Sequence, residues 1–192
     1  MKTNYTKQKL LLIVFFLILV SINTFGQCWS KISTGANHTL AIADNGTLWA
    51  WGTNGFGQLG VGILAFQGSI IPIQIGTATN WKEIAAGSEF SVAIRSGGLL
   101  GELGTLWAWG SNNLGQLGDG TFTNKNIPTQ IGTGFKWKQI SASSLHVMAI
   151  SDTGLFASGD RTLWGWGRNN FGQLGNGITA NQNNSNSNWY CH

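Results

Sequence analysis

The feature that most constrains this chain is a motif that occurs three times with the same internal spacing. Each copy begins with Leu-Trp-x-Trp-Gly and, four residues later, continues with Gly-Gln-Leu-Gly. The copies begin at Leu48, Leu106 and Leu163, so they are 58 and then 57 residues apart. A repeat of this length indicates an array of similar supersecondary units. A residue that recurs in every unit more often holds the unit together than performs chemistry.

Around the motif, each copy has the composition of short β-strands separated by turns. A Trp-x-x-Ile segment and a stretch ending in Ala-Ile precede the motif, and two copies add Pro-x-Gln-Ile-Gly after it. Runs of β-branched and aromatic residues bounded by Gly, Asn and Ser indicate strands, and no useful helical period is present. We predict an all-β chain of blade units with four antiparallel strands each, at about residues 29–76, 81–132 and 137–177.

The motif strand is expected to be buried on both sides. In an extended Leu48-Trp49-Ala50-Trp51 segment, both tryptophans point to one face and Leu and Ala to the other. Because both faces are apolar, the strand suits a position between stacked sheets. The glycines of Gly-Gln-Leu-Gly are expected to supply positive φ angles or close backbone approach.

The run from Gly35 to Gly60, GANHTLAIADNGTLWAWGTNGFGQLG, resembles the repeat of the regulator of chromosome condensation family. The resemblance covers about residues 29–177 and implies a β-propeller, which in that family has seven blades. Three units are too few for a closed ring, since propellers typically have about 4–8 blades. We therefore expect an incomplete ring, which is either a truncated product of a longer gene or one part of a ring assembled from several chains.

The copies differ at a few positions. Insertions at Gly97–Leu103 and Leu155–Asp160 are expected to lengthen one hairpin loop on one rim. The first insertion is apolar, and is either a contact surface or an irregularity of the repeat. The third copy has Ser143 where the others have Gly, and Gly165 where they have Ala.

Residues 1–26 have the pattern of a secretory signal peptide. Lys2, Lys7 and Lys9 precede the apolar run Leu10–Val20, and Thr24-Phe25-Gly26 offers a cleavage site. The run is shorter than the roughly 20 residues that span a bilayer. We expect a secreted or cell-surface protein with no stable membrane insertion after the leader is removed, and a retained anchor is the alternative.

The net charge depends on that leader. The whole chain has a net charge of +4, but three lysines lie in residues 1–26, which leaves 8 Lys and Arg against 7 Asp and Glu from Gln27 onward. This remainder contains no basic stripe, so the composition disfavours nucleic acid as a partner.

Both ends of the remaining chain carry a cysteine. Cys28 and Cys191 could pair in an oxidising compartment, although two unrelated terminal cysteines are the simpler interpretation. Residues 181–192 contain the low-complexity stretch NQNNSNSN, which predicts a disordered Asn-rich tail.

The residues that could act in catalysis or metal binding are better explained by packing and turn positions than by a functional site. His38 and His146 occupy the same repeat position, where the other copy has Phe90, so we interpret it as a packing position. No zinc spacing or nucleophile motif is present. We predict no catalytic, cofactor-binding or metal-binding residues and no cofactor. The acidic residues in Gly- and Asn-rich turns lack a calcium-loop spacing: Asp44, Asp119, Asp152 and Asp160.

These observations favour an exported, non-catalytic binding module for an unknown protein or glycan. The alternative is a fragment of a longer cell-surface or adhesin-like repeat protein. A propeller enzyme is disfavoured, and so is a nucleotide exchange factor, because the resemblance carries over no residue specific to that activity. Self-association that completes a ring is compatible with the repeat count.

Overall fold

The computed structural model describes residues 28–63, 67–97, 104–133, 136–152, 161–185 and 188–190. The predicted leader, most of both insertions and Cys191 lie outside these residues. The described residues form strands and no helix, so they contain no helix with the length and apolar character that a membrane crossing requires.

The strands form three consecutive blades, and in each blade four antiparallel strands pair in chain order. A bridge between Gly104 and Trp137 joins the second and third blades into one eight-stranded sheet. This confirms the predicted all-β fold and the four-stranded unit. Blade 1 comprises β1 (Trp29–Thr34), β2 (His38–Ala43), β3 (Leu48–Thr53) and β4 (Gly68–Gln74). Blade 2 comprises β5 (Trp81–Ala86), β6 (Phe90–Ser96), β7 (Gly104–Gly110) and β8 (Lys125–Ile131). Blade 3 comprises β9 (Lys136–Ala142), β10 (His146–Asp152), β11 (Arg161–Gly167) and β12 (Asn188–Tyr190).

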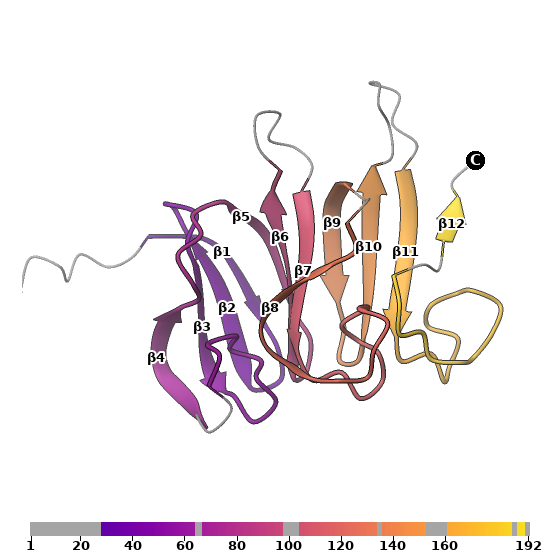
Figure 1. The fold of residues 1–192 in the computed structure, drawn as a ribbon, viewed down its shortest axis with the longest axis horizontal. Coiled ribbons are helices and arrows are strands. Elements are labelled where there is room, and N and C mark those ends of the chain that lie inside the picture. Colours follow the sequence, from indigo (N-terminus) through magenta and orange to yellow (C-terminus); the bar gives the residue numbers. More distant parts are fainter. Residues whose placement is uncertain are drawn as a thin grey trace, which may run out of the picture.

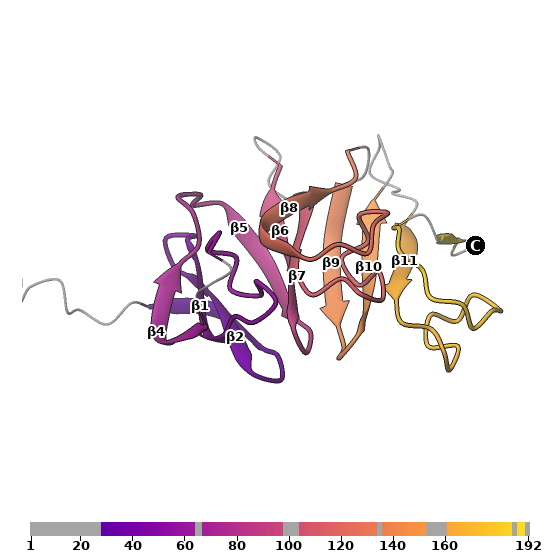
Figure 2. The same cartoon turned by 60° about the horizontal axis from the view of Figure 1, so that its bottom comes forward.

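The blades lie side by side in chain order, with blade 1 and blade 3 at opposite ends of the row (Figure 1). The same order is visible after the turn of the view in Figure 2. The first turns of the three blades, residues 34–36, 86–88 and 142–144, line one common hollow of about 230 Å³. The three blades are therefore arranged around this hollow, as blades are around the axis of a propeller.

Each blade contains a cluster of three tryptophans. In blade 2, Trp81 of β5 contacts Trp107 and Trp109 of β7, with ring centroids 6.1 and 6.4 Å apart. Both β7 tryptophans thus lie on one face, as predicted, and Leu106 and Ala108 on the other face are also largely buried in the core. The equivalent clusters are Trp29 with Trp49 and Trp51, and Trp137 with Trp164 and Trp166.

The Gly-Gln-Leu-Gly loop is closed by two buried amide side chains. In blade 2, the Leu117 backbone N–H donates to Asn112 Oδ1 at 3.0 Å, and the Leu114 N–H donates to Gln116 Oε1 at 2.8 Å. The same bonds recur in blades 1 and 3. Gly115 has a φ of +77°, in the left-handed region that favours glycine. The motif glutamine is therefore a structural residue, because it binds a loop N–H that has no strand partner.

Packing explains why Gly165 stands where the other two copies have alanine. Gly165 pairs with Met148 across β10 and β11, and a Cβ at Gly165 would lie 2.9 Å from Met148 Sδ. In blade 2 the corresponding pair is Ala108 with the smaller Val92. The glycine therefore makes room for the longer methionine side chain.

The structure differs from our prediction of a disordered tail over residues 181–192. Gln182 pairs with Gly167 in an isolated bridge, and β12 pairs with β11, so the segment supplies the fourth strand of blade 3. Its composition favours disorder, but its amide side chains form hydrogen bonds equivalent to those of the corresponding residues in blade 2. Asn181 Oδ1 accepts from the Asn169 N–H at 2.8 Å, as Asn124 Oδ1 does from the Asn112 N–H. Residues 186, 187, 191 and 192 lie outside the described part.

Candidate functional site

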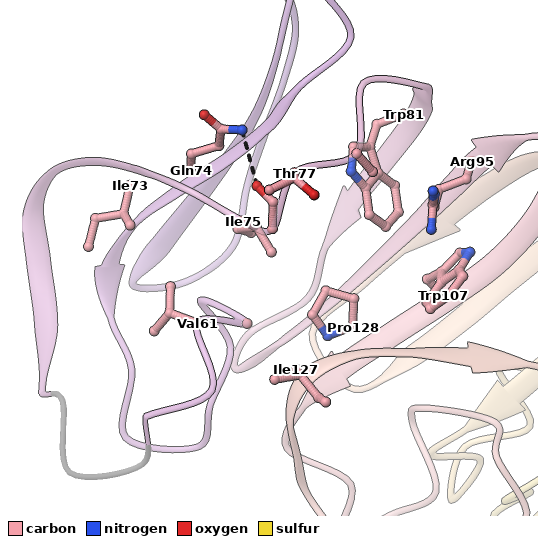
Figure 3. A pocket seen from close by; sticks show the side chains of 13 residues that line it. Val61, Ile73, Gln74, Ile75, Thr77, Trp81, Arg95, Trp107, Ile127 and Pro128 are labelled. Carbon is pink, nitrogen blue, oxygen red and sulfur yellow. Dashed lines mark hydrogen bonds between the residues drawn. The ribbon is translucent and has the colours of Figure 1, made fainter.

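A groove of about 700 Å³ opens between blade 1 and blade 2 (Figure 3). Blade 1 contributes Gly60 and Val61 of the loop after β3, the end of β4 and the residues that follow it, and blade 2 contributes residues of β5, β6, β7 and β8. Most of the wall is apolar, and the one charged side chain in it is Arg95. The labelled apolar wall residues are Val61, Ile73, Ile75, Trp81, Trp107, Ile127 and Pro128.

Arg95 of β6 lies over the rings of two adjacent tryptophans. Its guanidinium carbon is 5.2 Å from the centroid of Trp81 and 5.1 Å from that of Trp107, which is within cation–π range. Its Nε donates to Asn80 Oδ1 at 3.2 Å. Within the described part of the chain, no carboxylate forms an ion pair with Arg95. The groove therefore holds a positioned cation whose terminal N–H groups suit an acceptor ligand.

The wall of the groove contains a buried indole N–H, that of Trp81. Its side chain is buried, and its Nε1 has no hydrogen-bond partner among the described residues. In Figure 3 the ring nitrogen lies on the side of Thr77, away from Arg95. Trp107, in contrast, donates its Nε1–H to Thr105 Oγ1 at 2.8 Å. A buried N–H without a partner costs roughly 1–3 kcal/mol.

His38 lies outside the groove, at the joint between blades 1 and 2. It is buried, and its Nε2 is 2.9 Å from Ser91 Oγ. Ser91 donates its hydroxyl hydrogen to the Gln58 carbonyl at 2.8 Å, so His38 Nε2 must be the donor to Ser91. Burial lowers the pKa of His38 to about 4, and the Ser88 carbonyl opposes this more weakly. His38 is therefore a neutral packing side chain at neutral pH.

The structure does not bring the two repeat histidines together. His146 lies in blade 3, with Nδ1 2.5 Å from Ser143 Oγ. Burial also lowers the pKa of His146 below its ordinary value.

The acidic residues of the turns form no cluster in the part that the structure describes. Burial would raise the pKa of Asp119, but hydrogen bonds from Thr121 and Asn112 and the ion pair with Lys125 outweigh it, so this pKa lies below its usual value. Asp44 is exposed in the turn after β2, and Asp152 ends β10, whereas Asp160 lies outside the described residues. No group of three or more His, Cys, Asp or Glu residues among those described is placed to hold a metal ion.

Sequence reasoning missed the groove because the repeat alignment directs attention to shared positions. Arg95 occupies the position of Ala43 in blade 1 and Ser151 in blade 3. A charge present in one copy only, next to a strand of buried residues, was the available signal. The apolar partners could not be identified, because they come from two different units.

The fold and the groove define the class of this protein: a β-propeller repeat module with a ligand-sized groove at a blade joint. Residues 45–94, 104–150 and 160–187 match the regulator of chromosome condensation (RCC1) repeat. Residues 29–58 and 81–116 match a second description of the same repeat. The chain belongs to the RCC1 repeat family.

The chain is similar to parts of larger proteins. It is 31% identical to the ultraviolet-B receptor UVR8 of Arabidopsis thaliana over 151 residues, which are 77% of this chain and 31% of that protein. It is 31% identical to the human E3 ubiquitin-protein ligase HERC2 over 150 residues, 76% of this chain and 3% of that protein. The chain thus spans less than a third of either relative.

Solved structures show the same fold. Yeast RCC1 (Prp20), in its complex with Kap60, superposes with a TM-score of 0.68 at 22% identity, over 82% of this chain and 36% of that chain. Human WBSCR16 superposes with a TM-score of 0.68 at 20% identity, over 88% of this chain and 41% of that chain.

Proposed function

We propose that this protein is an exported, non-catalytic propeller module that binds a protein partner at the groove between blades 1 and 2. The observation that carries the proposal is Arg95, which lies against the rings of Trp81 and Trp107 beside an apolar wall. A groove of this composition fits an extended segment with an aliphatic side chain next to a carboxylate. The carboxylate would pair with Arg95, and the aliphatic group would pack on the exposed Ile127 and on Pro128.

The relatives support a protein partner. Yeast Prp20 has been solved with Kap60, and its binding to Gsp1p and histones has been described. Those partners belong to that protein, and the likeness supports only the use of the fold for protein binding. HERC2 matches over 3% of its length, so the match gives no reason to transfer its ligase activity.

The groove favours a protein segment over a glycan. A sugar ring would need an open indole face on which to stack. Arg95 covers the faces of Trp81 and Trp107 that meet in the groove, and Trp81 is buried. An aliphatic side chain, in contrast, needs only the apolar wall.

The groove is tested by selecting peptides from a random displayed library on the purified chain. We expect enriched peptides that combine an aliphatic residue with Asp or Glu. Arg95→Gln should weaken their binding by about tenfold, the worth of one charge-assisted hydrogen bond of about 1.4 kcal/mol. The matched control is Arg168→Gln, because Arg168 also contacts an aromatic ring but lies in blade 3. Selected peptides that bind both variants equally well would contradict the proposed site.

Export is tested separately by the N-terminus of the protein. The support for export is the pattern of residues 1–26. When the full chain is expressed in a cell with a general secretory pathway, the protein recovered outside the cytoplasm should begin at Gln27. A chain that keeps Met1 and stays with the cytoplasm would contradict export and leave the groove proposal standing.

A further inference from the structure

Two residues at the joint between blades 1 and 2 depart together from the repeat. Asn80 directly precedes Trp81, at the position where blade 3 has Lys136. Arg95 pairs with Trp81 across β5 and β6, and Ser151 holds the same position in blade 3. Arg95 Nε donates to Asn80 Oδ1 at 3.2 Å. The two changes therefore form one local arrangement, made by residues that blade 3 lacks.

Arg95 does not replace the role that Ser151 has in blade 3. Ser151 is buried, and its hydroxyl oxygen accepts from Trp164 Nε1 at 2.7 Å. In blade 2 the corresponding indole, that of Trp107, donates to Thr105 instead. The indole of blade 2 thus has a partner without Arg95, so this hydrogen bond does not account for the guanidinium.

The side chain of Asn80 is fixed at both ends of its amide group. Its Nδ2 donates to the Ser96 carbonyl at 3.0 Å, and the Ser96 N–H donates to the Asn80 carbonyl at 2.8 Å. Because the amide nitrogen is bound to Ser96, the amide oxygen is directed to the Nε of Arg95. Asn80 thus connects the end of β6 to the guanidinium group.

These contacts leave one edge of the guanidinium for a ligand. The rings of Trp81 and Trp107, 5.2 and 5.1 Å from the guanidinium carbon, restrict its plane (Figure 3). A guanidinium can bind a carboxylate through Nε and one terminal nitrogen, or through both terminal nitrogens. Asn80 occupies Nε, so the edge with both terminal nitrogens remains. Among the described residues, no group accepts a hydrogen bond from that edge.

We propose that Asn80 is a positioning residue, which holds Arg95 so that both terminal nitrogens receive a carboxylate of the partner. The inference rests on the proposed function, because the ligand is the acidic segment proposed for the groove. A side chain that is already ordered loses less freedom on binding. Two parallel N–H···O bonds need a ligand group with two acceptor oxygens. A carboxamide has one such oxygen, so Asn80 makes the groove distinguish a carboxylate from its amide.

The first test compares two peptides. One is an acidic peptide selected on the purified chain, and the other is its counterpart with Asn or Gln in place of the acidic residue. The wild type should prefer the acidic peptide by about tenfold. Asn80→Ala should reduce this preference by roughly threefold, since Arg95 must then be ordered on binding. An unchanged preference would overturn the proposal.

The matched control for a merely structural effect is Asn126→Ala. It removes a carboxamide bond of 3.0 Å at the same joint, from Asn126 to the Gly62 carbonyl, and leaves Arg95 and Asn80 in place. Both dissociation constants should change by the same factor in this variant. If the control lost as much preference as Asn80→Ala, Asn80 would act through the joint and the proposal would be wrong.

A second comparison tests whether Asn80 acts through the guanidinium. Arg95→Lys keeps the charge but has no Nε for Asn80 to hold and no planar fork. In this background, Asn80→Ala should leave the preference for the acidic peptide unchanged. An equal reduction in both backgrounds would contradict a role through Arg95. Asn80 is exposed, so the variants should fold, and circular dichroism checks this.

Nuclear magnetic resonance of ¹⁵N-labelled arginine measures which edge binds. Arg95→Gln identifies the Arg95 signals, because the remaining arginines are Arg161 and Arg168. The acidic peptide should slow the rotation of the Arg95 terminal nitrogens and leave the Nε–H shift nearly unchanged. A larger change at Nε would show that the carboxylate displaces Asn80, which would overturn the proposal.

The two proposals fail in different ways. If Arg95→Gln binds the selected peptides as well as the wild type does, the groove is not their site and both proposals fall. If Arg95→Gln weakens binding but Asn80→Ala keeps the full preference for the acidic peptide, only the role of Asn80 falls.

Discussion

The joint between blades 1 and 2 and the joint between blades 2 and 3 have the same hydrogen bonds to backbone carbonyls, which we call the shared frame. The two joints differ in one pair of side chains. In both, an indole N–H binds a loop carbonyl of the preceding blade. In both, an asparagine carboxamide also binds a glycine carbonyl in that blade, from Asn126 in β8 and from Asn183 in the segment before β12. The first joint adds the polar pair His38 and Ser91, and the second has Phe90 and Val147 in the same places.

The comparison shows which part of a joint is fixed and which part can vary. The shared contacts end on backbone carbonyls, so they depend on the conformation of the glycine loop. The variable pair consists of two side chains that face each other, so a polar pair can be replaced by an apolar pair if both members change together. A single change would leave a polar group buried without its partner, which is costly.

The largest expected effect tests the shared frame. Gly118→Ala should destabilise the chain by about 3 kcal/mol or more, because the new Cβ would lie 2.7 Å from Trp166 Nε1 and overpacking adds to the strain of a positive φ. Gly175→Ala has nearly the same φ, +68° against +72°, but nothing within 4 Å. It should cost only about 1–2 kcal/mol. Urea unfolding of the two variants, at concentrations where the chain is monomeric, measures the difference, and equal costs would contradict the role of the joint.

The next effect separates the two joints by pH. The folded-state pKa of His38 is about 4, below its ordinary value of 6.5, so the folded state resists protonation. Its contribution to stability is complete above about pH 6.5 and is lost as the pH falls toward 4. The shift corresponds to roughly 3 kcal/mol at most.

The matched variant converts the first joint into the second. His38→Phe with Ser91→Val should remove this part of the acid sensitivity, measured as the free energy of unfolding at pH 7 and pH 4. His146→Gln should leave most of it in place, because His146 is only half-buried. If the double variant and the wild type lost stability equally between the two pH values, the burial of His38 would not be the cause.

A smaller effect tests whether the carboxamide contacts of Asn126 and Asn183 are equivalent. Asn183→Ala and Asn126→Ala each remove one carboxamide bond of 3.0 Å to a glycine carbonyl. Each should cost about 1 kcal/mol. Thermal unfolding of both variants measures this, and a neutral Asn183→Ala would mean that the Asn-rich segment does not hold blade 2.

The smallest effect belongs to the ion pair of the first joint. Lys31 and Glu83 pair across this joint at partly exposed positions, and Gln139 takes the place of Glu83 in blade 3. The pair should contribute less than about 1 kcal/mol. A double-mutant cycle with Lys31→Met and Glu83→Gln measures it, and a coupling free energy above 2 kcal/mol would show that charge matters more than the shared frame.

The sequence predicted the blade fold because residues equivalent to Trp109, Gln116 and Gly118 recur in each copy. The indole–carbonyl bond that they form is the same at both joints. The Asn-rich segment was misjudged, since its composition hides the register that places Asn183 on Gly120. The groove was not predictable for a different reason. Arg95 is special only through Trp81 and Trp107 and through the apolar residues of another blade, and that combination arises from the joint rather than from any one repeat.

The contacts that Asn126 and Asn183 make with the preceding blade impose an order on folding during synthesis. The carboxamide of Asn126 binds Gly62, 64 residues earlier, and that of Asn183 binds Gly120, 63 residues earlier. The loop that contains Gly62 or Gly120 can therefore complete its contacts only after the last part of the next repeat has also left the ribosome or a translocation pore. Each blade should therefore complete its folding only after the following blade has been synthesised.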